Sequence, residues 1–315
     1  MTQTASRPQF SAETDGHGRF VRQQNAFRHR ISSDPTDEFA AEPGRYHLYV
    51  SLACPWAHRS IIVRRLKKLE NVVGMTVVDP IRDERGWAFR DSRDGSYGPD
   101  PVNGFQFLSQ AYLKTEPNYQ GRWTVPCLWD RKTGQLISND YHTLSTDLAT
   151  KFERWADTSV DLYPEALRGE IDAINADVFQ NVNNAVYRAG FATSQEAYDE
   201  AVDALFNALD RLEVRLSKQR FLVGNALTEA DIRLFTTLVR FDAVYYVHFK
   251  CNVRRIVDYP NLWAYARDLF QRPGFGDTVN WDHIKRHYYM THEQLNPYRI
   301  VPKGPAVDWL APHGR

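Results

Sequence analysis

Residues 46–57 read YHLYVSLACPWA, and this stretch decides the fold of the first half of the chain. Its aromatic and branched residues predict a short buried strand that ends just before Cys54. Pro55 suits the first turn of a helix, where its missing N–H is harmless, and apolar residues recur at helical spacing as far as Leu69. Residues 72–78 read as a second strand. This β-α-β opening predicts two parallel strands joined by a right-handed crossover.

Further strands and helices are predicted after this opening. Residues 80–120 are rich in Gly, Asp, Arg, Ser and Pro, and so long a connection predicts a functional loop. The elements predicted next are strands over 124–129 and 136–138 and helices over 141–150, 201–216, 232–244 and 260–270. Thr228 and Asp231 have the spacing of a capping box. The pattern as a whole predicts an extension over 1–44, an α/β domain over 45–152, an all-helical domain over 160–290 and an irregular tail over 291–315.

Cys54 is the first candidate for chemistry. It follows a strand and precedes a helix, and the free N–H groups and positive end of a helix stabilise a thiolate. A buried structural thiol is the alternative at this position. Ala57 stands where a dithiol redox protein has its second cysteine, so a mixed disulfide on Cys54 needs an external thiol to resolve it. Cys127 and Cys251 lack such a setting and are predicted to be structural.

Val125 and Pro126 form the second candidate feature. A proline in a strand belongs at an edge, at the strand start or at a bulge. A cis peptide bond here, beside Cys54, would expose the backbone of Val125 to an extended ligand that binds like an added strand. A proline on an edge strand without any ligand is the equal alternative.

Composition excludes several classes of protein. The chain has 315 residues, enough for two domains, and its 39 basic and 39 acidic residues give no broad attraction to nucleic acid or to anionic membranes. The three cysteines lie far apart, which argues against a disulfide framework or a metal cluster and for a reducing compartment. The first 20 residues lack the apolar core of a signal peptide, and no run approaches the length of a membrane span. We therefore expect a cytoplasmic protein without a bound metal.

Taken together, the elements resemble a thioredoxin-like α/β domain followed by the all-α C-terminal domain of glutathione transferases. Within that superfamily the chain resembles the glutathionyl-hydroquinone reductases, or xi-class transferases. The motifs that carry this closer resemblance are Cys54-Pro55-Trp56-Ala57, Gly18-Arg19-Phe20-Val21-Arg22, Asp161-Leu162-Tyr163-Pro164, Asn183-Asn184-Ala185-Val186-Tyr187-Arg188, Phe241-Asp242-Ala243-Val244-Tyr245, His283-Ile284-Lys285-Arg286-His287-Tyr288-Tyr289 and Asn296-Pro297.

The resemblance implies roles for individual residues. It makes Cys54 the nucleophile, Tyr187 the proton donor, and Tyr245 and Tyr288 helpers that stabilise the thiolate. It implies that Trp87 packs on the thiol substrate and that Arg122 and Val125 hold its peptide part. Asp140 and Tyr141 stand where glutathione-using members carry Glu-Ser for the γ-glutamyl end. The bulk of tyrosine predicts that glutathione is a poor co-substrate, with the sugar-linked thiol mycothiol as the alternative. The other interpretation is that Tyr141 points away and that His142 or Thr143 supplies the contact to glutathione.

The activity that the resemblance implies is a thiol-dependent reduction. The enzyme removes glutathione or a related thiol from thiol-hydroquinone conjugates and uses glutathione or another low-molecular-weight thiol as co-substrate, with no permanently bound cofactor. Its relatives are usually homodimers. Two other functions remain open: a glutaredoxin-like thiol transferase that acts on mixed disulfides, and a non-catalytic ligand-binding protein. Cys54 and the three tyrosines argue against the last of these.

Overall fold

The structure is a computed structural model that describes residues 13–315. The first twelve residues of the predicted extension lie outside the described part. Two compact units divide the described chain: unit 1 comprises residues 23–160 and 280–291, and unit 2 comprises residues 13–22, 161–279 and 292–315. The limits of the two units differ from the predicted domain limits in two places. The extension contributes to both units, and residues 280–291 belong to unit 1 and not to the helical unit.

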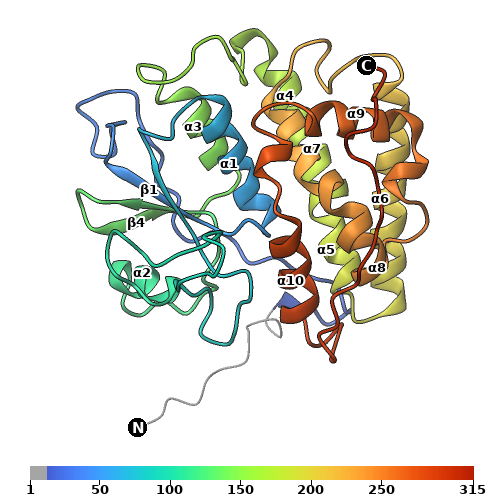
Figure 1. Cartoon of the computed structure of the whole chain (residues 1–315), viewed down its shortest axis with the longest axis horizontal. Coiled ribbons are helices and arrows are strands. Elements are labelled where there is room, and N and C mark those ends of the chain that lie inside the picture. Colours follow the sequence, from blue (N-terminus) through green and yellow to red (C-terminus); the bar gives the residue numbers. More distant parts are fainter. Residues whose placement is uncertain (1–12) are drawn as a thin grey trace. The chain divides into compact units, whose positions relative to one another are not determined.

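Unit 1 is built around a four-stranded sheet in the order β2-β1-β3-β4. Its elements are β1 (Tyr46–Val50), α1 (Pro55–Leu66), β2 (Gly74–Val77), α2 (Leu108–Thr115), β3 (Cys127–Asp130), β4 (Gln135–Ser138), α3 (Leu144–Thr150) and α10 (Trp281–Thr291). β1 runs parallel to β2 and antiparallel to β3, and β4 is antiparallel to β3. Figure 1 shows α1 and α3 on one face of the sheet and α2 on the other. The thioredoxin-like fold and its parallel opening pair are confirmed.

Helix α2 corrects the loop predicted over 80–120. It spans only Leu108–Thr115, and its start is capped by the Gln110 side chain, whose oxygen accepts from the backbone N–H groups of Gln106 and Phe107. Leu108, Ala111 and Tyr112 form its buried face. Two helical turns inside a polar segment are too short to give a clear hydrophobic period.

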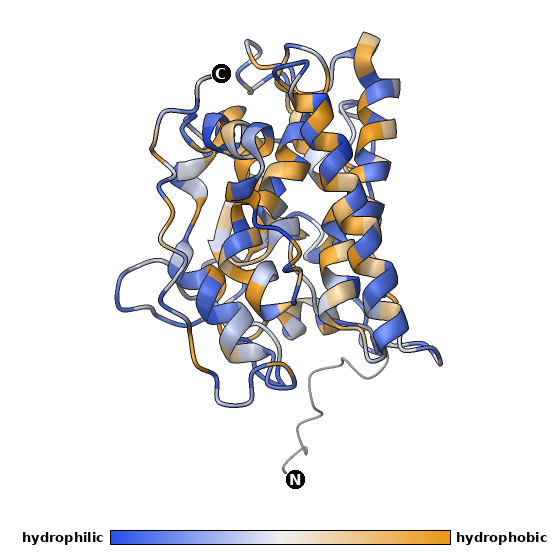
Figure 2. Ribbon diagram, turned by 90° about the vertical axis from the view of Figure 1, so that its right-hand side faces the viewer, coloured by the Kyte–Doolittle hydropathy of each residue, from blue (hydrophilic) through white to orange (hydrophobic). Residues whose placement is uncertain are grey.

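Unit 2 is built mainly from helices. Its helices are α4 (Arg168–Val178), α5 (Ala185–Gly190), α6 (Gln195–Leu216), α7 (Glu229–Arg240), α8 (Tyr246–His248) and α9 (Pro260–Phe270), with π-helical turns at Phe179–Asn183 and Phe241–Tyr245 and short 3₁₀ turns at Glu165–Leu167, Ile256–Asp258 and Gly276–Thr278. Hydrophobic and hydrophilic residues alternate along the helices in Figure 2, as expected where one face is buried. The predicted capping box forms at the start of α7, where Asp231 accepts from the Thr228 N–H at 2.8 Å.

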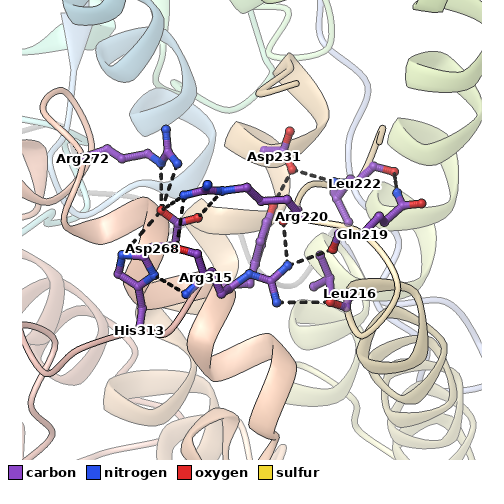
Figure 3. A network of polar contacts seen from close by, with 10 residues as sticks. Leu216, Gln219, Arg220, Leu222, Asp231, Asp268, Arg272, His313 and Arg315 are labelled. Atoms are coloured by element: carbon purple, nitrogen blue, oxygen red, sulfur yellow. Dashed lines mark hydrogen bonds and ion pairs between the residues drawn. The ribbon is translucent and has the colours of Figure 1, made fainter. Parts of the chain in front are cut away.

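The tail 292–315 contains no helix or strand, as its prolines predict, yet polar contacts fix its end. The Arg315 guanidinium donates to the carbonyl oxygens of Leu216, Gln219 and Arg220. Asp268 on α9 accepts from Arg220 and Arg272 and lies 3.9 Å from the His313 ring, as Figure 3 shows.

Within residues 13–315, no helix has the length and apolar character needed to cross a membrane.

Candidate active site

Cys54 occupies the N-cap of α1, where the backbone has the extended conformation of a cap, with φ −76° and ψ 120°. The first turn of α1 carries no acidic side chain, so no carboxylate in that turn offsets the positive end of the helix. The Cys54 side chain is partly exposed, whereas Cys127 and Cys251 are buried. Burial raises the pKa of both buried thiols well above the ordinary value. Cys54 is therefore the cysteine best placed to react as a thiolate.

The segment that precedes β3 lies beside the Cys54 thiol. The Cys54 Sγ donates to the carbonyl oxygen of Val125 over 3.4 Å. The Val125–Pro126 bond is cis. Tyr112 on α2 holds the same segment, because its hydroxyl donates to the Thr124 oxygen at 2.8 Å and accepts from the Thr124 N–H at 3.1 Å. Val125 thus lies in direct contact with the candidate nucleophile.

Asp140 and Tyr141 lie between β4 and α3, and both are buried. The Asp140 carboxylate accepts from the backbone N–H of His142 at 3.0 Å and from the Thr143 hydroxyl at 3.3 Å. The Tyr141 ring packs against Trp56, with ring centroids 4.6 Å apart. Tyr141 therefore lies against the first turn of α1, and Asp140 orders the turn that leads into α3.

Arg122 lies in the loop between α2 and β3, and its backbone is held at both polar atoms. Its N–H donates to the side-chain oxygen of Gln23 at 3.1 Å, and its carbonyl oxygen accepts from the Tyr119 hydroxyl at 3.0 Å. Burial raises the pKa of Tyr119 to about 12, so this hydroxyl stays protonated and can donate at neutral pH. The position of Arg122 is consequently fixed by neighbours on two different segments.

Trp87 lies buried in the long loop that leads from β2 to α2. The His287 imidazole on α10 stacks on the Trp87 indole, with ring centroids 4.8 Å and planes 23° apart. The Nδ1 atom of His287 lies 2.9 Å from the carbonyl oxygen of Pro80, which can only accept, so Nδ1 carries the proton. Tyr288, the next residue of α10, is buried in the same unit as Cys54.

Unit 2 contains the other two candidate tyrosines. Tyr187 on α5 and Tyr245 in the π-helical turn have ring centroids 6.0 Å apart, and both residues are buried. The Arg22 guanidinium lies 4.7 Å from the Tyr187 ring centroid, and its Nε donates to the Asn184 side-chain oxygen at 2.8 Å. A positive charge over the ring stabilises the phenolate that forms when a tyrosine gives up its proton.

The structure thus distributes the predicted site residues over both units. Unit 1 contains Cys54, Trp87, Arg122, Val125, Asp140, Tyr141 and Tyr288, and unit 2 contains Tyr187 and Tyr245. Sequence reasoning gave no role to three residues that contact this set: Gln23, Asn25 and His287. His287 belongs to a motif quoted for the resemblance, but Gln23 and Asn25 lie in a polar extension without any periodic pattern.

Among residues 13–315, no group of three or more His, Cys, Asp or Glu side chains is arranged to hold a metal ion.

A thioredoxin-like unit with a cysteine at the start of its first helix, in one chain with an all-helical unit, defines a glutathione transferase. The model of the glutathione S-transferase C-terminal domain family matches residues 195–268. Glutathionyl-hydroquinone reductase YqjG of Escherichia coli is 50% identical over 304 residues, which cover 95% of this chain and 92% of that protein. Glutathionyl-hydroquinone reductase PcpF of Sphingobium chlorophenolicum is 47% identical over 289 residues, covering 92% and 90%.

Comparison with solved structures leads to the same family as comparison with these relatives. Glutathione-bound YqjG superposes with a TM-score of 0.88, covering 92% of this chain and 96% of that one at 50% identity. The xi-class transferase of Phanerochaete chrysosporium gives a TM-score of 0.89 at 48% identity, covering 93% and 99%. The chain belongs to the glutathionyl-hydroquinone reductase family, the xi class of glutathione transferases.

Proposed function

We propose that this protein removes glutathione from glutathionyl-hydroquinone conjugates and that Cys54 is the nucleophile. The observation that carries the proposal is the Cys54 thiol itself, which is partly exposed at the positive end of α1 while the other two thiols are buried. Two relatives that match over nine-tenths of the chain are named glutathionyl-hydroquinone reductases, which supports the same substrate class.

The first half-reaction breaks the bond between the ring carbon and sulfur. An aryl carbon is a poor leaving group, so a general acid first protonates the ring carbon that bears the sulfur and produces a ketone-like tautomer. The Cys54 thiolate then attacks that sulfur, and the electron pair of the carbon–sulfur bond returns to the ring. The products are the free hydroquinone, whose ring carbon has gained a hydrogen, and a mixed disulfide between Cys54 and glutathione.

The second half-reaction regenerates the enzyme. A free thiol attacks the sulfur of glutathione in the mixed disulfide, and Cys54 leaves as a thiolate. The net change is reduction of the conjugate to hydroquinone and oxidation of two thiols to one disulfide. Ala57 in place of a second cysteine requires this external thiol, because the motif holds no internal one.

Tyr187 is the proposed proton donor. Its phenol lies below the Arg22 guanidinium, and that charge favours release of the proton. Tyr245 and Tyr288 are proposed to stabilise the Cys54 thiolate by donating hydrogen bonds, and Trp87 to stack on the thiol. Unlike Cys54 and Val125, these assignments rest on the resemblance to the family together with the burial of each ring.

Glutathione is the proposed co-substrate, and mycothiol is the second candidate. Arg122 and Val125 are proposed to hold the peptide part of the thiol, and Asp140 the cationic end of a γ-glutamyl group. The second candidate is favoured by the Asp140 carboxylate, which already accepts from His142 and Thr143, and by Tyr141, which offers an aromatic face to a sugar ring.

Steady-state kinetics with two conjugates of one hydroquinone test the proposal. Wild-type enzyme should release hydroquinone from the glutathionyl or the mycothiol conjugate, and Cys54→Ser should release none, because a serine hydroxyl stays protonated and forms no disulfide. The ratio of kcat/KM for the two conjugates identifies the thiol. If Cys54→Ser keeps substantial turnover, the covalent mechanism is wrong.

The assembly and the location of the protein are inferred from its family and from its cysteines. We infer a homodimer from the family, and a cytoplasmic location from three cysteines that are all free thiols, which is typical of proteins in reducing compartments.

A further inference from the structure

The segment 23–29 of the extension lies along the outer edge of the sheet in unit 1, beside β4. β4 is the last strand of the sheet, and Arg28 forms an antiparallel bridge with Ser138. The backbone N–H of His29 donates to the Ile137 oxygen at 3.1 Å, and the N–H of Asn139 donates to the Phe27 oxygen at 3.0 Å. These bonds fix the register of the segment, because each extended residue has a defined partner.

Aromatic packing anchors the same segment against the loop that carries Arg122. The Phe27 ring packs on Tyr112 and on Tyr119, with centroids 5.6 Å apart in each pair. Phe27 also donates its N–H to the Asn139 side chain at 3.1 Å. The chain on either side of Phe27 is therefore held in place, so the side chains just before it have defined positions.

Gln23 uses this placement to fix the backbone of Arg122. Its side-chain oxygen accepts the Arg122 N–H at 3.1 Å, and its amide also hydrogen bonds to the Tyr119 hydroxyl, which in turn donates to the Arg122 oxygen. The fit is close, since a Cβ at Gly121 would collide with both the Tyr119 hydroxyl and the Gln23 amide. Gln23 thus closes a ring of hydrogen bonds around the candidate thiol-binding arginine.

Asn25 makes the corresponding contact with Asp140. Its amide nitrogen donates to the Asp140 Oδ1 at 2.9 Å, and the same oxygen accepts the His142 N–H at 3.0 Å. Hydrogen bonds to a carboxylate are among the stronger ones and fix its orientation. Two alternate residues of one short segment therefore hold two of the residues proposed to bind the thiol.

We propose that Gln23 and Asn25 are positioning residues for thiol binding, acting through Arg122 and Asp140, and that the extension is in this way part of the thiol site. The inference rests on the proposed function, because Arg122 and Asp140 are taken as the groups that meet the charged ends of the thiol. The groups that Gln23 and Asn25 hold, Arg122 and Asp140, are proposed to bind the thiol and not to break a bond, so the bond-breaking step should be independent of them.

Matched variants separate this role from a purely structural one. Gln23→Leu and Asn25→Leu remove the hydrogen bonds at similar volume. Gln23→Glu keeps an acceptor for the Arg122 N–H, and Asn25→Gln keeps a donor. Gln24→Leu is the control, because Gln24 is an exposed amide on the same segment whose side-chain oxygen accepts from Arg28 at 3.5 Å.

The expected effect lies in affinity and not in the chemical step. Each Leu variant at 23 or 25 should raise the Kd for the thiol about 3- to 10-fold, the range for loss of one positioning hydrogen bond. The single-turnover rate at saturating conjugate should stay within about twofold of wild type, and KM should rise in step with Kd. Gln23→Glu and Asn25→Gln should recover most of the affinity, and Gln24→Leu should behave as wild type.

Calorimetric titration with S-methylglutathione and S-methylmycothiol, which cannot form a disulfide, measures the Kd without any turnover. Unchanged Kd values in both Leu variants, or an equal loss in Gln24→Leu, would overturn the inference, and so would a wild-type enzyme that binds neither probe. If the wild type binds a probe but turns over neither conjugate, the proposed function fails while the Kd values still decide the role of Gln23 and Asn25. Urea unfolding of each variant shows whether a changed Kd reflects lost stability.

Discussion

The surroundings of Cys54 differ from those of the other two cysteines. Its thiol is partly exposed at a helix N-terminus, whereas burial raises the pKa of the Cys127 and Cys251 thiols. We therefore expect iodoacetamide to label Cys54 at least tenfold faster than either buried cysteine at about pH 6, since only a thiolate reacts. Peptide mapping of the folded protein checks this. Equal labelling of Cys127 or Cys251 would contradict it.

Tyr187 should contribute at the level of a general acid. Tyr187→Phe removes the phenol proton and keeps the ring, so kcat should fall by about 10²- to 10⁴-fold. Tyr198→Phe is the matched control in unit 2, because the Tyr198 hydroxyl donates to the Lys250 carbonyl oxygen and has no proposed role. Single-turnover release of hydroquinone measures both. If the two variants lose activity equally, Tyr187 is not the proton donor.

The sequence points to some of the candidate site residues more clearly than to others. Cys54 stands out because its strand, proline and helix are all local, and Val125 because a proline follows it. Gln23 and Asn25 gave no signal, because their contacts are with Arg122 and Asp140, far along the chain. Such contacts depend on the tertiary fold and leave no spacing pattern in the sequence.

Among the elements, β1 carries a buried histidine whose protonation opposes folding. Burial, helped by the Arg131 guanidinium, lowers the pKa of His47 from 6.5 to about 4. Arg131 donates to Nδ1 of His47, so Nε2 carries the proton that is donated to the Thr76 hydroxyl. Below about pH 6.5, His47 binds a proton in the unfolded chain but stays neutral in the folded chain. The contribution of neutral His47 to the free energy of unfolding is therefore complete above about pH 6.5 and is lost as the pH falls toward 4.

The lowered pKa of His47 should make the free energy of unfolding depend measurably on pH. The free energy of unfolding should fall by about 2 kcal/mol between about pH 7.5 and pH 5 on account of His47 alone. His47→Asn keeps an acceptor for Arg131 and cannot titrate, so this variant should lose that part of the slope in urea unfolding. His17→Asn, at an exposed histidine, is the control. An unchanged slope in His47→Asn would contradict the argument.

Elements with a strong local pattern were predicted correctly, and elements fixed by distant contacts were not. Helix α9 and the capping box of α7 appear where expected, and α6 ends at the predicted Leu216 but begins earlier than predicted, at Gln195 after the Ser194 cap. Helix α2 was missed because it is short and depends on the Gln110 cap. The helix expected over 232–244 is interrupted by a π-helical turn after Arg240, a change in hydrogen bonding that apolar spacing does not reveal.

At the scale of the whole chain, one polar segment is bonded into both compact units. Residues 13–22 belong to unit 2, where Arg19 pairs with Glu200, and the chain from Gln23 onward belongs to unit 1. Composition alone predicted only an extension that wraps the body or stays partly disordered. The bonds of Arg19 to Glu200 and of Gln23 to Arg122 hold this polar segment in place.

We expect the chain to form a homodimer. Tyr298, Ile300 and Leu310 of the tail are 85%, 68% and 73% exposed, which leaves large apolar side chains available for an interface. Light scattering should give twice the chain mass of 36.5 kDa, and Ile300→Lys should shift the equilibrium toward the single chain. A mass of one chain for the wild type in dilute solution would refute the dimer.

In the proposed mechanism, Cys54 receives the thiol directly from the conjugate. Intact-protein mass spectrometry after mixing the enzyme with a glutathionyl-hydroquinone, without free thiol, tests it most directly. We expect one glutathionyl group on Cys54, one equivalent of released hydroquinone, and neither product with Cys54→Ser. Hydroquinone release without a protein adduct, or an adduct on Cys127 or Cys251, would contradict it.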